Sequence, residues 1–370
     1  MGCATTAHYG LPIHPVTDER ACVSRATLAD VARLAGVSPS TASLTFSGSG
    51  PVSAATRERV LNAARELGFS GPDPLARSLR RGSTGVVGVI VGGDLAGNFR
   101  DPVAVRTLDG IADALGAHDV GMLLIRASET GGGADLTRRA AMDAAIIAAA
   151  ISGESSIVTA LRERGLGVVT MEPNHEGTSY ISIDDRAGMK TLAKQVLELG
   201  HERFALVTLP WAPGAGYGPR TDLSMDASTF SFTANRVNGV LDAGVKPTSV
   251  YVTKGSLVEE GFEAAKALLS APERPTVIMA MSDLLAAGVL LAARELGISV
   301  PGSLSVTGFD GVDLSWLAPD IITSVQQPYT RKGQLAGEAA VELVKGGAPR
   351  SVELECWPRP GTTLAQAART

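Results

Sequence analysis

The sequence is poor in cysteine, in aromatic residues and in long apolar runs. Its 370 residues include three cysteines, and only 4% are Phe, Trp or Tyr. Cys3, Cys22 and Cys356 show no CxxC spacing and no Cys/His cluster, which excludes a disulfide framework and a zinc site of the usual spacing. No uncharged apolar stretch is long enough to cross a bilayer. We therefore expect a soluble, cytoplasmic protein with no cofactor and no membrane partner.

The motifs of common enzyme classes are also missing. We find no G-x-x-x-x-G-K-[ST] phosphate loop, no G-x-G-x-x-G after a predicted strand and no serine nucleophile elbow. The five histidines are scattered, and His201 follows a predicted helix, whose C-terminus we expect it to cap. These absences argue against an enzyme.

The net charge of −5 is unevenly distributed along the chain. Between residues 24 and 81 lie eight arginines and four acidic residues, an excess of four positive charges that leaves −9 for the remainder. A small basic module attached to an acidic body is typical of a nucleic-acid-binding protein.

The stretch 27–46, TLADVARLAGVSPSTASLTF, has the pattern helix, tight turn, helix. Gly36 ends the first helix and Ser38-Pro39 opens the second, which spans about 38–46. Thr27 is expected to cap the first helix, with Asp30 in the capping-box position. The first helix places four apolar residues on one face: Leu28, Val31, Ala32 and Ala35.

A third helix is predicted from the N-cap Ser53 to Gly68. Its inward residues are Val60, Ala63, Ala64 and Leu67. The three helices should form a compact domain over 24–69, preceded by a disordered extension over 1–23. A linker over 70–84 contains GPDP and then an amphipathic hinge helix with Leu75, Ala76 and Leu79 on one side.

From residue 85 the chain alternates apolar strands with amphipathic helices. The predicted strands are 86–91, 121–125, 144–150, 167–171, 204–208, 249–253, 276–280 and 304–309, and the helices 103–117, 155–164, 186–199, 232–243, 257–270, 283–296 and 329–345. This order indicates parallel sheets covered on both faces. The unit runs twice, which predicts two similar α/β lobes with a ligand site at the carboxyl ends of the strands, in the cleft between the lobes.

These residues resemble the LacI/GalR family of bacterial transcription regulators. Its pattern T-L-x-D-V-A-x-x-A-G-V-S-x-x-T-x-S matches residues 27–43, V-S-x-x-T-R matches 52–57, and L-A-R-S-L matches 75–79. The resemblance implies an N-terminal all-α helix-turn-helix DNA-binding domain followed by an α/β two-lobed periplasmic-binding-protein-like effector domain over 85–360. A plain three-helix bundle would explain the apolar positions but neither the turn nor the arginine excess.

The resemblance also implies which residues meet double-stranded operator DNA. The second helix enters the major groove, and the hydroxyls of Thr27, Ser53 and Thr56 bind phosphates. Leu79 wedges between base pairs in the minor groove, although packing of an apolar helix face would equally explain a leucine there. Leu44 stands where the family commonly has arginine, so the operator should differ from the usual one. The complete set is Thr27, Leu28, Pro39, Ser40, Thr41, Ser43, Leu44, Ser53, Thr56, Ala76 and Leu79.

Strand-end polar residues are the candidates for a sugar-like effector. Arg236 in R-x-x-G and Asp310 in GFDG match family positions, although Arg236 could instead pair with a helix acid and Asp310 could cap a turn. Asp283 is expected to cap the helix that follows it. Trp211, in the long loop 210–229, would stack on a sugar ring or lie on mobile surface. The effector set is Arg236, Asp310, Ser282, Glu172, Asn98, Phe99 and Trp211.

The family layout implies three crossings between the lobes. It assigns 85–183 with 310–325 to one lobe, 184–309 with 326–360 to the other, and 361–370 to a tail. We expect a homodimer on a pseudo-palindromic operator, joined through 103–117 and segments near 310–325, with a tetramer as a further possibility. The alternatives are an exported sugar-binding protein, against which the helix-turn-helix and the lack of a signal peptide argue, and a sensor with a catalytic body.

Overall fold

The structure is a computed structural model that describes residues 26–48, 50–71, 78, 82–93, 95–127, 133–149, 155–172, 178–212, 214–220, 223 and 230–367. It divides into two compact units, Met1–Gly82 and Ser83–Thr370, and we describe each by itself. The expected extension over 1–23 and the hinge positions Ala76 and Leu79 lie outside the described residues. No helix among the described residues is long and apolar enough to span a membrane.

The first unit contains three helices with a shared apolar core. Helices α1 (Leu28–Ala35), α2 (Pro39–Ser47) and α3 (Ala54–Glu66) follow one another as predicted. Thr27 and Asp30 form the capping box of α1, while Ser38 and Ser53 cap α2 and α3 through their hydroxyls. The core consists of Val31, Ala32, Ala35, Ala42, Val60, Ala63 and Ala64, with Leu28, Val37, Phe46 and Phe69 at its edge.

One predicted core residue lies elsewhere. Leu67 is 36% exposed, because α3 already ends at Glu66 and Leu67 is its C-cap. Phe69 packs against the core in its place, with its ring in an edge-to-face contact with Phe46.

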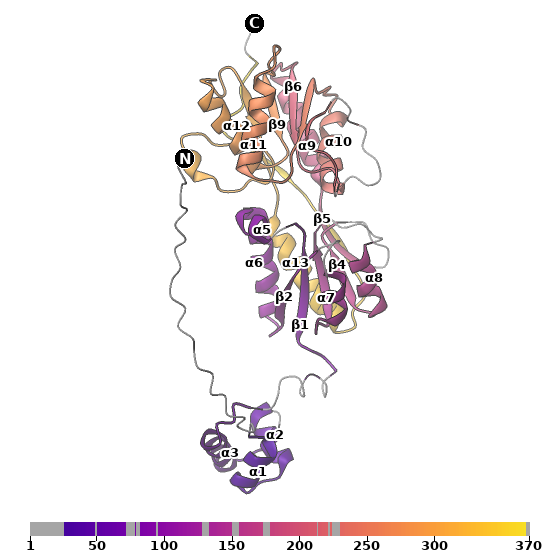
Figure 1. Ribbon diagram of the computed structural model, residues 1–370, viewed down its shortest axis with the longest axis vertical. Coiled ribbons are helices and arrows are strands. Elements are labelled where there is room, and N and C mark those ends of the chain that lie inside the picture. Colours follow the sequence, from indigo (N-terminus) through magenta and orange to yellow (C-terminus); the bar gives the residue numbers. More distant parts are fainter. Residues whose placement is uncertain are drawn as a thin grey trace, which may run out of the picture. The chain divides into compact units, whose positions relative to one another are not determined.

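The first lobe of the second unit is a six-stranded parallel sheet (Figure 1). The strand order is β12 (Ser351–Leu354), β5 (Ser179–Ile183), β4 (Gly167–Thr170), β3 (Ala144–Ala148), β1 (Val86–Val91) and β2 (Gly121–Arg126). Helices α6 (Pro102–Gly116) and α13 (Tyr329–Val344) pack on the face that carries Val87, Val89 and Val91. On the other face, with Ile90, lie α7 (Gly133–Arg139) and α8 (Ser156–Glu163). A short helix, α5 (Leu95–Arg100), follows β1.

The second lobe is a five-stranded sheet. Its order is β10 (Ser305–Thr307), β9 (Val277–Ala280), β6 (Phe204–Thr208), β8 (Ser249–Val252) and β7 (Gly218–Arg220), of which only β7 is antiparallel to its neighbour. The pair α9 (Asp185–Glu198) and α10 (Ser231–Asp242) covers one side, and the pair α11 (Val258–Leu269) and α12 (Asp283–Glu295) the other (Figure 1). Both sheets are doubly wound, as the sequence predicted.

The chain crosses between the lobes three times, but the predicted assignment of the last segments is wrong. Residues 310–323, with the short helix η1 (Ser315–Leu317), stay in the second lobe, where Leu317 and Ile322 join its core. α13 packs on α6, and β12 pairs with β5, so both belong to the first lobe. The crossing strands β11 (Ser324–Gln326) and β13 (Trp357–Arg359) pair with each other antiparallel.

The expected tail is also part of the fold. The amide of Val306 donates to the carbonyl of Thr363 at 2.8 Å, and the amide of Ala367 donates to the carbonyl of Leu199 at 2.9 Å. Thr363 is fully buried. Residues 361–367 therefore complete the second lobe, because they satisfy backbone groups that its strand β10 would otherwise leave unpaired.

Helices α6 and α13 touch backbone to backbone through glycine. A Cβ on Gly110 would overlap the carbonyl oxygen of Thr330, and one on Gly333 would overlap that of Thr107. Neither position has room for a side chain, so the two glycines set the distance between the helices.

We expect Gly110→Ala to lower the free energy of unfolding by about 1–3 kcal/mol, because the added methyl forces the two helices apart. Gly116 in the same helix is a matched control, since a Cβ there meets no atom within 4 Å. Gly116→Ala should leave stability unchanged or raise it slightly. Urea unfolding of both variants measures the difference, and equal midpoints would show that the helix contact tolerates a side chain.

Candidate functional site

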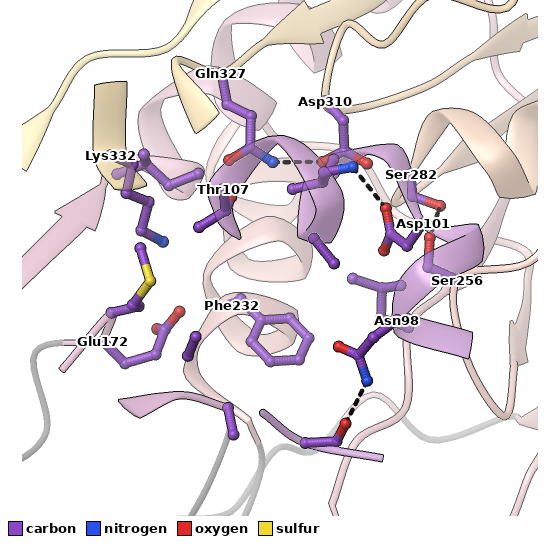
Figure 2. A pocket seen from close by; sticks show the side chains of 18 of the residues that line it. Asn98, Asp101, Thr107, Glu172, Phe232, Ser256, Ser282, Asp310, Gln327 and Lys332 are labelled. Atoms are coloured by element: carbon purple, nitrogen blue, oxygen red, sulfur yellow. Dashed lines mark hydrogen bonds between the residues drawn. The ribbon is translucent and has the colours of Figure 1, made fainter. Parts of the chain in front are cut away.

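A cavity of about 410 Å³ lies between the lobes, at the carboxyl ends of their strands. Its lining residues follow β1, β3, β4 and β5 of the first lobe and β6, β8, β9 and β10 of the second, or come from the segments that join the lobes. Figure 2 shows its polar lining. The polar and aromatic residues are Asn98, Asp101, Thr107, Glu172, Asp185, Phe232, Arg236, Ser256, Ser282, Asp310, Gln327 and Lys332. Five of the seven predicted effector residues are therefore brought together.

Arg236 on α10 is the most constrained cation in this cavity. Its Nε donates to Asp185 Oδ1 at 2.7 Å and its Nη1 donates to the carbonyl of Met281 at 2.6 Å. The same Nη1 lies 3.4 Å from Asp310 Oδ1, and the guanidinium stacks 3.8 Å above the Phe309 ring. Arg236 thus pairs with an acidic residue of a helix and also faces the cavity. Its predicted ion pair and its predicted place in the effector site are therefore compatible.

Asp310 follows β10, the last strand of the second lobe, in a conformation that is unusual for a residue with a side chain. Its φ is 109°, and its amide donates to the carbonyl of Val325 at 2.8 Å. Gln327 Nε2 donates to its Oδ1 at 2.6 Å. Burial raises the pKa of Asp310 well above its usual range, while the Arg236 guanidinium opposes that shift. The carboxyl group is thus fixed by the crossing segment that leads to α13.

Ser282, rather than Asp283, caps α12, which corrects the predicted cap. Ser282 Oγ accepts from the amide of Leu285 at 3.2 Å and from Ser256 Oγ at 2.8 Å. Asp283 is the first residue of the helix, and its buried carboxylate accepts from Ser324 Oγ at 2.6 Å and from the amide of Val312 at 2.9 Å. Burial raises the pKa of Asp283 to about 7. Asp283 therefore braces a crossing, and Ser282 lines the cavity.

The wall contributed by the first lobe is mostly acidic and amide in character. Glu172, directly after β4, accepts a hydrogen bond from Ser231 Oγ of the second lobe. Burial raises its pKa, and the Lys332 ammonium opposes this. Asp101 caps α6 by accepting from the amide of Val103 at 2.9 Å, and burial raises its pKa as well. Asn98 on α5 donates from Nδ2 to the carbonyl of Gly92 at 2.6 Å.

Two aromatic residues of the predicted site do not line the cavity. Phe99 is 58% exposed, because the next position along α5 points about 100° away from Asn98 around the helix axis. Trp211 is buried, donates from Nε1 to Thr208 Oγ1 at 3.0 Å, and lies beneath the Arg220 guanidinium. Phe232 on α10 is the aromatic residue that reaches into the cavity (Figure 2).

Several lining residues escaped prediction. Asp101 and Asp185 stand at helix starts directly after a strand or a short helix, a position that signals a cap as readily as a ligand. Gln327 and Lys332 come from the crossing that was assigned to the wrong lobe.

The helix-turn-helix unit exposes most of its predicted DNA-reading residues. Pro39, Ser40 and Leu44 are exposed on α2, while Thr41 and Ser43 are half-buried. The hydroxyls of Thr27 and Ser53 are occupied as caps, and Thr56 Oγ1 accepts from Ser53 Oγ at 2.9 Å. Leu28 packs at the edge of the core, so its side chain serves the fold.

Comparisons with known proteins cover both units. Residues 27–71 match the family described as bacterial regulatory proteins, lacI family, and residues 193–362 match a periplasmic binding protein-like domain. The chain is 33% identical over 353 residues to the HTH-type transcriptional regulator IpsA of Corynebacterium glutamicum, covering 92% of this chain and 97% of that protein.

Solved structures of the same family share the fold. A LacI-family transcriptional regulator from Corynebacterium glutamicum has a TM-score of 0.68 at 27% identity and covers 91% of this chain and 98% of its own. The transcriptional regulator CelR in complex with cellobiose has a TM-score of 0.65 at 25% identity and covers 92% and 100%. These relatives are DNA-binding regulators and not enzymes, and the chain belongs to the LacI family of bacterial transcription regulators.

Proposed function

We propose that this regulator is a sequence-specific repressor whose affinity for operator DNA is set by a small, uncharged, polyhydroxylated effector bound between the two lobes. The single observation that carries the effector class is the cavity lining. Arg236 is engaged by Asp185 and Asp310, and further carboxyl, amide and hydroxyl groups surround a space that also contains the Phe232 ring. Such a lining accepts hydrogen bonds from hydroxyls and offers an apolar face to a sugar ring.

The comparison with CelR supports the same class, since that regulator binds cellobiose in a chain of the same fold. The runner-up is a periplasmic-type sugar-binding protein without DNA function. The helix-turn-helix unit, with its own core and caps, favours the regulator. Because it acts on DNA, we place the protein in the cytoplasm.

For DNA recognition, we propose that the exposed face of α2 contacts the bases. The exposed Pro39, Ser40 and Leu44 would meet base edges, with Thr41 and Ser43 beside them, and the helix N-termini capped by Thr27 and Ser53 would face phosphates. Thr56 would assist at the N-terminus of α3, whereas Leu28 would act through the core. The proposed roles of Ala76 and Leu79 in the minor groove are unchanged.

We further propose a homodimer, which places two reading helices on a pseudo-palindromic operator. Exposed apolar side chains on both predicted interface segments support it: Val105 on α6 is 39% exposed, Trp316 56% and Ile321 49%. A tetramer would require an additional surface.

The experiment selects binding sites for the full chain from a random DNA library and then titrates sugars and polyols against the complex. We expect a pseudo-palindromic site and at least one neutral compound that weakens binding. Because effector and operator affinities are linked, that compound must also bind the DNA-bound protein more weakly than the free protein. Selection of no site, or a response restricted to anionic compounds, would contradict the proposal.

A further inference from the structure

Lys332 is the cation in the cavity that no described residue pairs with. Arg236 is held by two carboxylates and a carbonyl, whereas Lys332 Nζ makes neither a hydrogen bond nor an ion pair within the described part of the chain. Yet Lys332 is only 9% exposed and lines the cavity. A nearly buried lysine side chain with no partner among the described residues reduces the stability of the empty protein, so its presence requires another explanation.

Glu172 lies on the same wall of the cavity as Lys332 (Figure 2). One of its oxygens, Oε2, accepts from Ser231, and Oε1 has no hydrogen-bond partner among the described residues. The Lys332 charge acts on the Glu172 carboxyl and lowers its pKa against the effect of burial, although the two groups form no direct ion pair in the described structure. A donor and an acceptor of the first lobe thus line the same cavity.

We infer that Lys332 and Glu172 form a subsite for two neighbouring hydroxyl groups of an uncharged effector. The ammonium donates to the oxygen of one hydroxyl, and Glu172 Oε1 accepts the proton of the other. This inference rests on the proposed function and narrows its effector class to compounds with vicinal hydroxyls.

The charge of the surroundings favours this assignment over an anion site. Four carboxyl groups line the same cavity, those of Asp101, Glu172, Asp185 and Asp310. A phosphate or carboxylate at Lys332 would approach Glu172, and burial already disfavours negative charge at Glu172, Asp101 and Asp310. A hydroxyl pair satisfies both side chains without added charge.

The first test compares the empty full-length chains. Lys332→Met keeps the length of the side chain and removes the unpaired charge, so we expect its melting temperature to rise by about 2–4 °C. Lys345→Met, on the exposed end of α13, is the matched control and should leave the melting temperature unchanged. An equal or lower melting temperature for Lys332→Met would overturn the inference, since it would mean that the Lys332 charge does not destabilise the empty fold.

The second test adds ribose, glucose, cellobiose or glucose 6-phosphate to the same chains. A neutral sugar that stabilises the unaltered chain should bind Lys332→Met and Glu172→Gln about tenfold more weakly or worse. Unchanged affinity, or preference for glucose 6-phosphate that disappears in Lys332→Met, would overturn the inference. If none of the neutral sugars stabilises the unaltered chain, the proposed effector class fails for these probes, while the melting of the empty chains still decides the role of Lys332.

Discussion

A chain that begins at Ser83 is expected to lose sequence-specific DNA binding completely and to keep its folded lobes. The helix-turn-helix unit has a core of its own, and the division at Gly82–Ser83 leaves the cores of both lobes intact. Specific operator binding by regulators is typically about 10³–10⁷-fold tighter than non-specific binding, and this entire difference should disappear.

The measurement combines fluorescence anisotropy on the selected operator with thermal unfolding. The shortened chain should melt cooperatively and be stabilised by the same effector as the full chain, which serves as the control for folding. Operator binding that survives the deletion would place the DNA-reading surface on the lobes and refute the assignment of α2.

Arg236→Ala is expected to abolish the effector response and to destabilise the lobes by about 3–5 kcal/mol. The variant leaves the buried carboxyl groups of Asp185 and Asp310 without their counter-ion, and removing one partner of a buried pair is costly. It also removes the guanidinium that stacks on Phe309. Operator binding should persist at temperatures where the variant remains folded, because the reading helix belongs to the other unit.

Arg186→Ala provides the matched control for this variant. Arg186 also pairs with an aspartate, Asp242, through two hydrogen bonds, but its side chain is 50% exposed. We expect little change in melting temperature there, since solvent screens exposed pairs. Arg236→Lys should recover part of the stability but not the response, because an ammonium cannot reproduce the planar fork. A normal effector response in Arg236→Ala would remove this residue from the pocket.

Local sequence patterns predicted those helices and strands whose own residues are sufficient to determine them. All eight predicted strands and all seven predicted helices of the lobes are present, since each is a continuous apolar run or an amphipathic stretch. The missed strands β5, β7, β11, β12 and β13 are short and carry polar residues, and they exist because a neighbouring strand pairs with them. Helices α5 and α7 are equally short and were not predicted.

In the cavity, too, local sequence patterns predicted some residues, and long-range pairing determined others. Arg236, Asp310, Ser282 and Glu172 follow predicted strands or lie on predicted helices, so the rule that ligands bind at strand ends located them. Asp185 begins a helix, where a capping role is as simple an explanation, whereas Gln327 and Lys332 depend on which lobe receives each crossing segment. That choice is decided by long-range pairing, such as β12 on β5, which no local pattern encodes. Phe232 on α10 lines the cavity, whereas the Trp211 indole is turned toward Thr208, and the sequence does not show the direction of either side chain.

The glycine contact between α6 and α13 has a mechanical consequence for signalling. Helices that meet backbone to backbone cannot slide past one another without first separating, so the first lobe should rotate as one solid piece when an effector arrives. The motion then concentrates in the three segments that join the lobes. It is a rotation about this hinge rather than a sliding of one lobe along the other. Lys332 lies on α13 and Gln327 just before it, so both would rotate with the first lobe. Effector binding in the cavity would therefore change the angle between the two lobes.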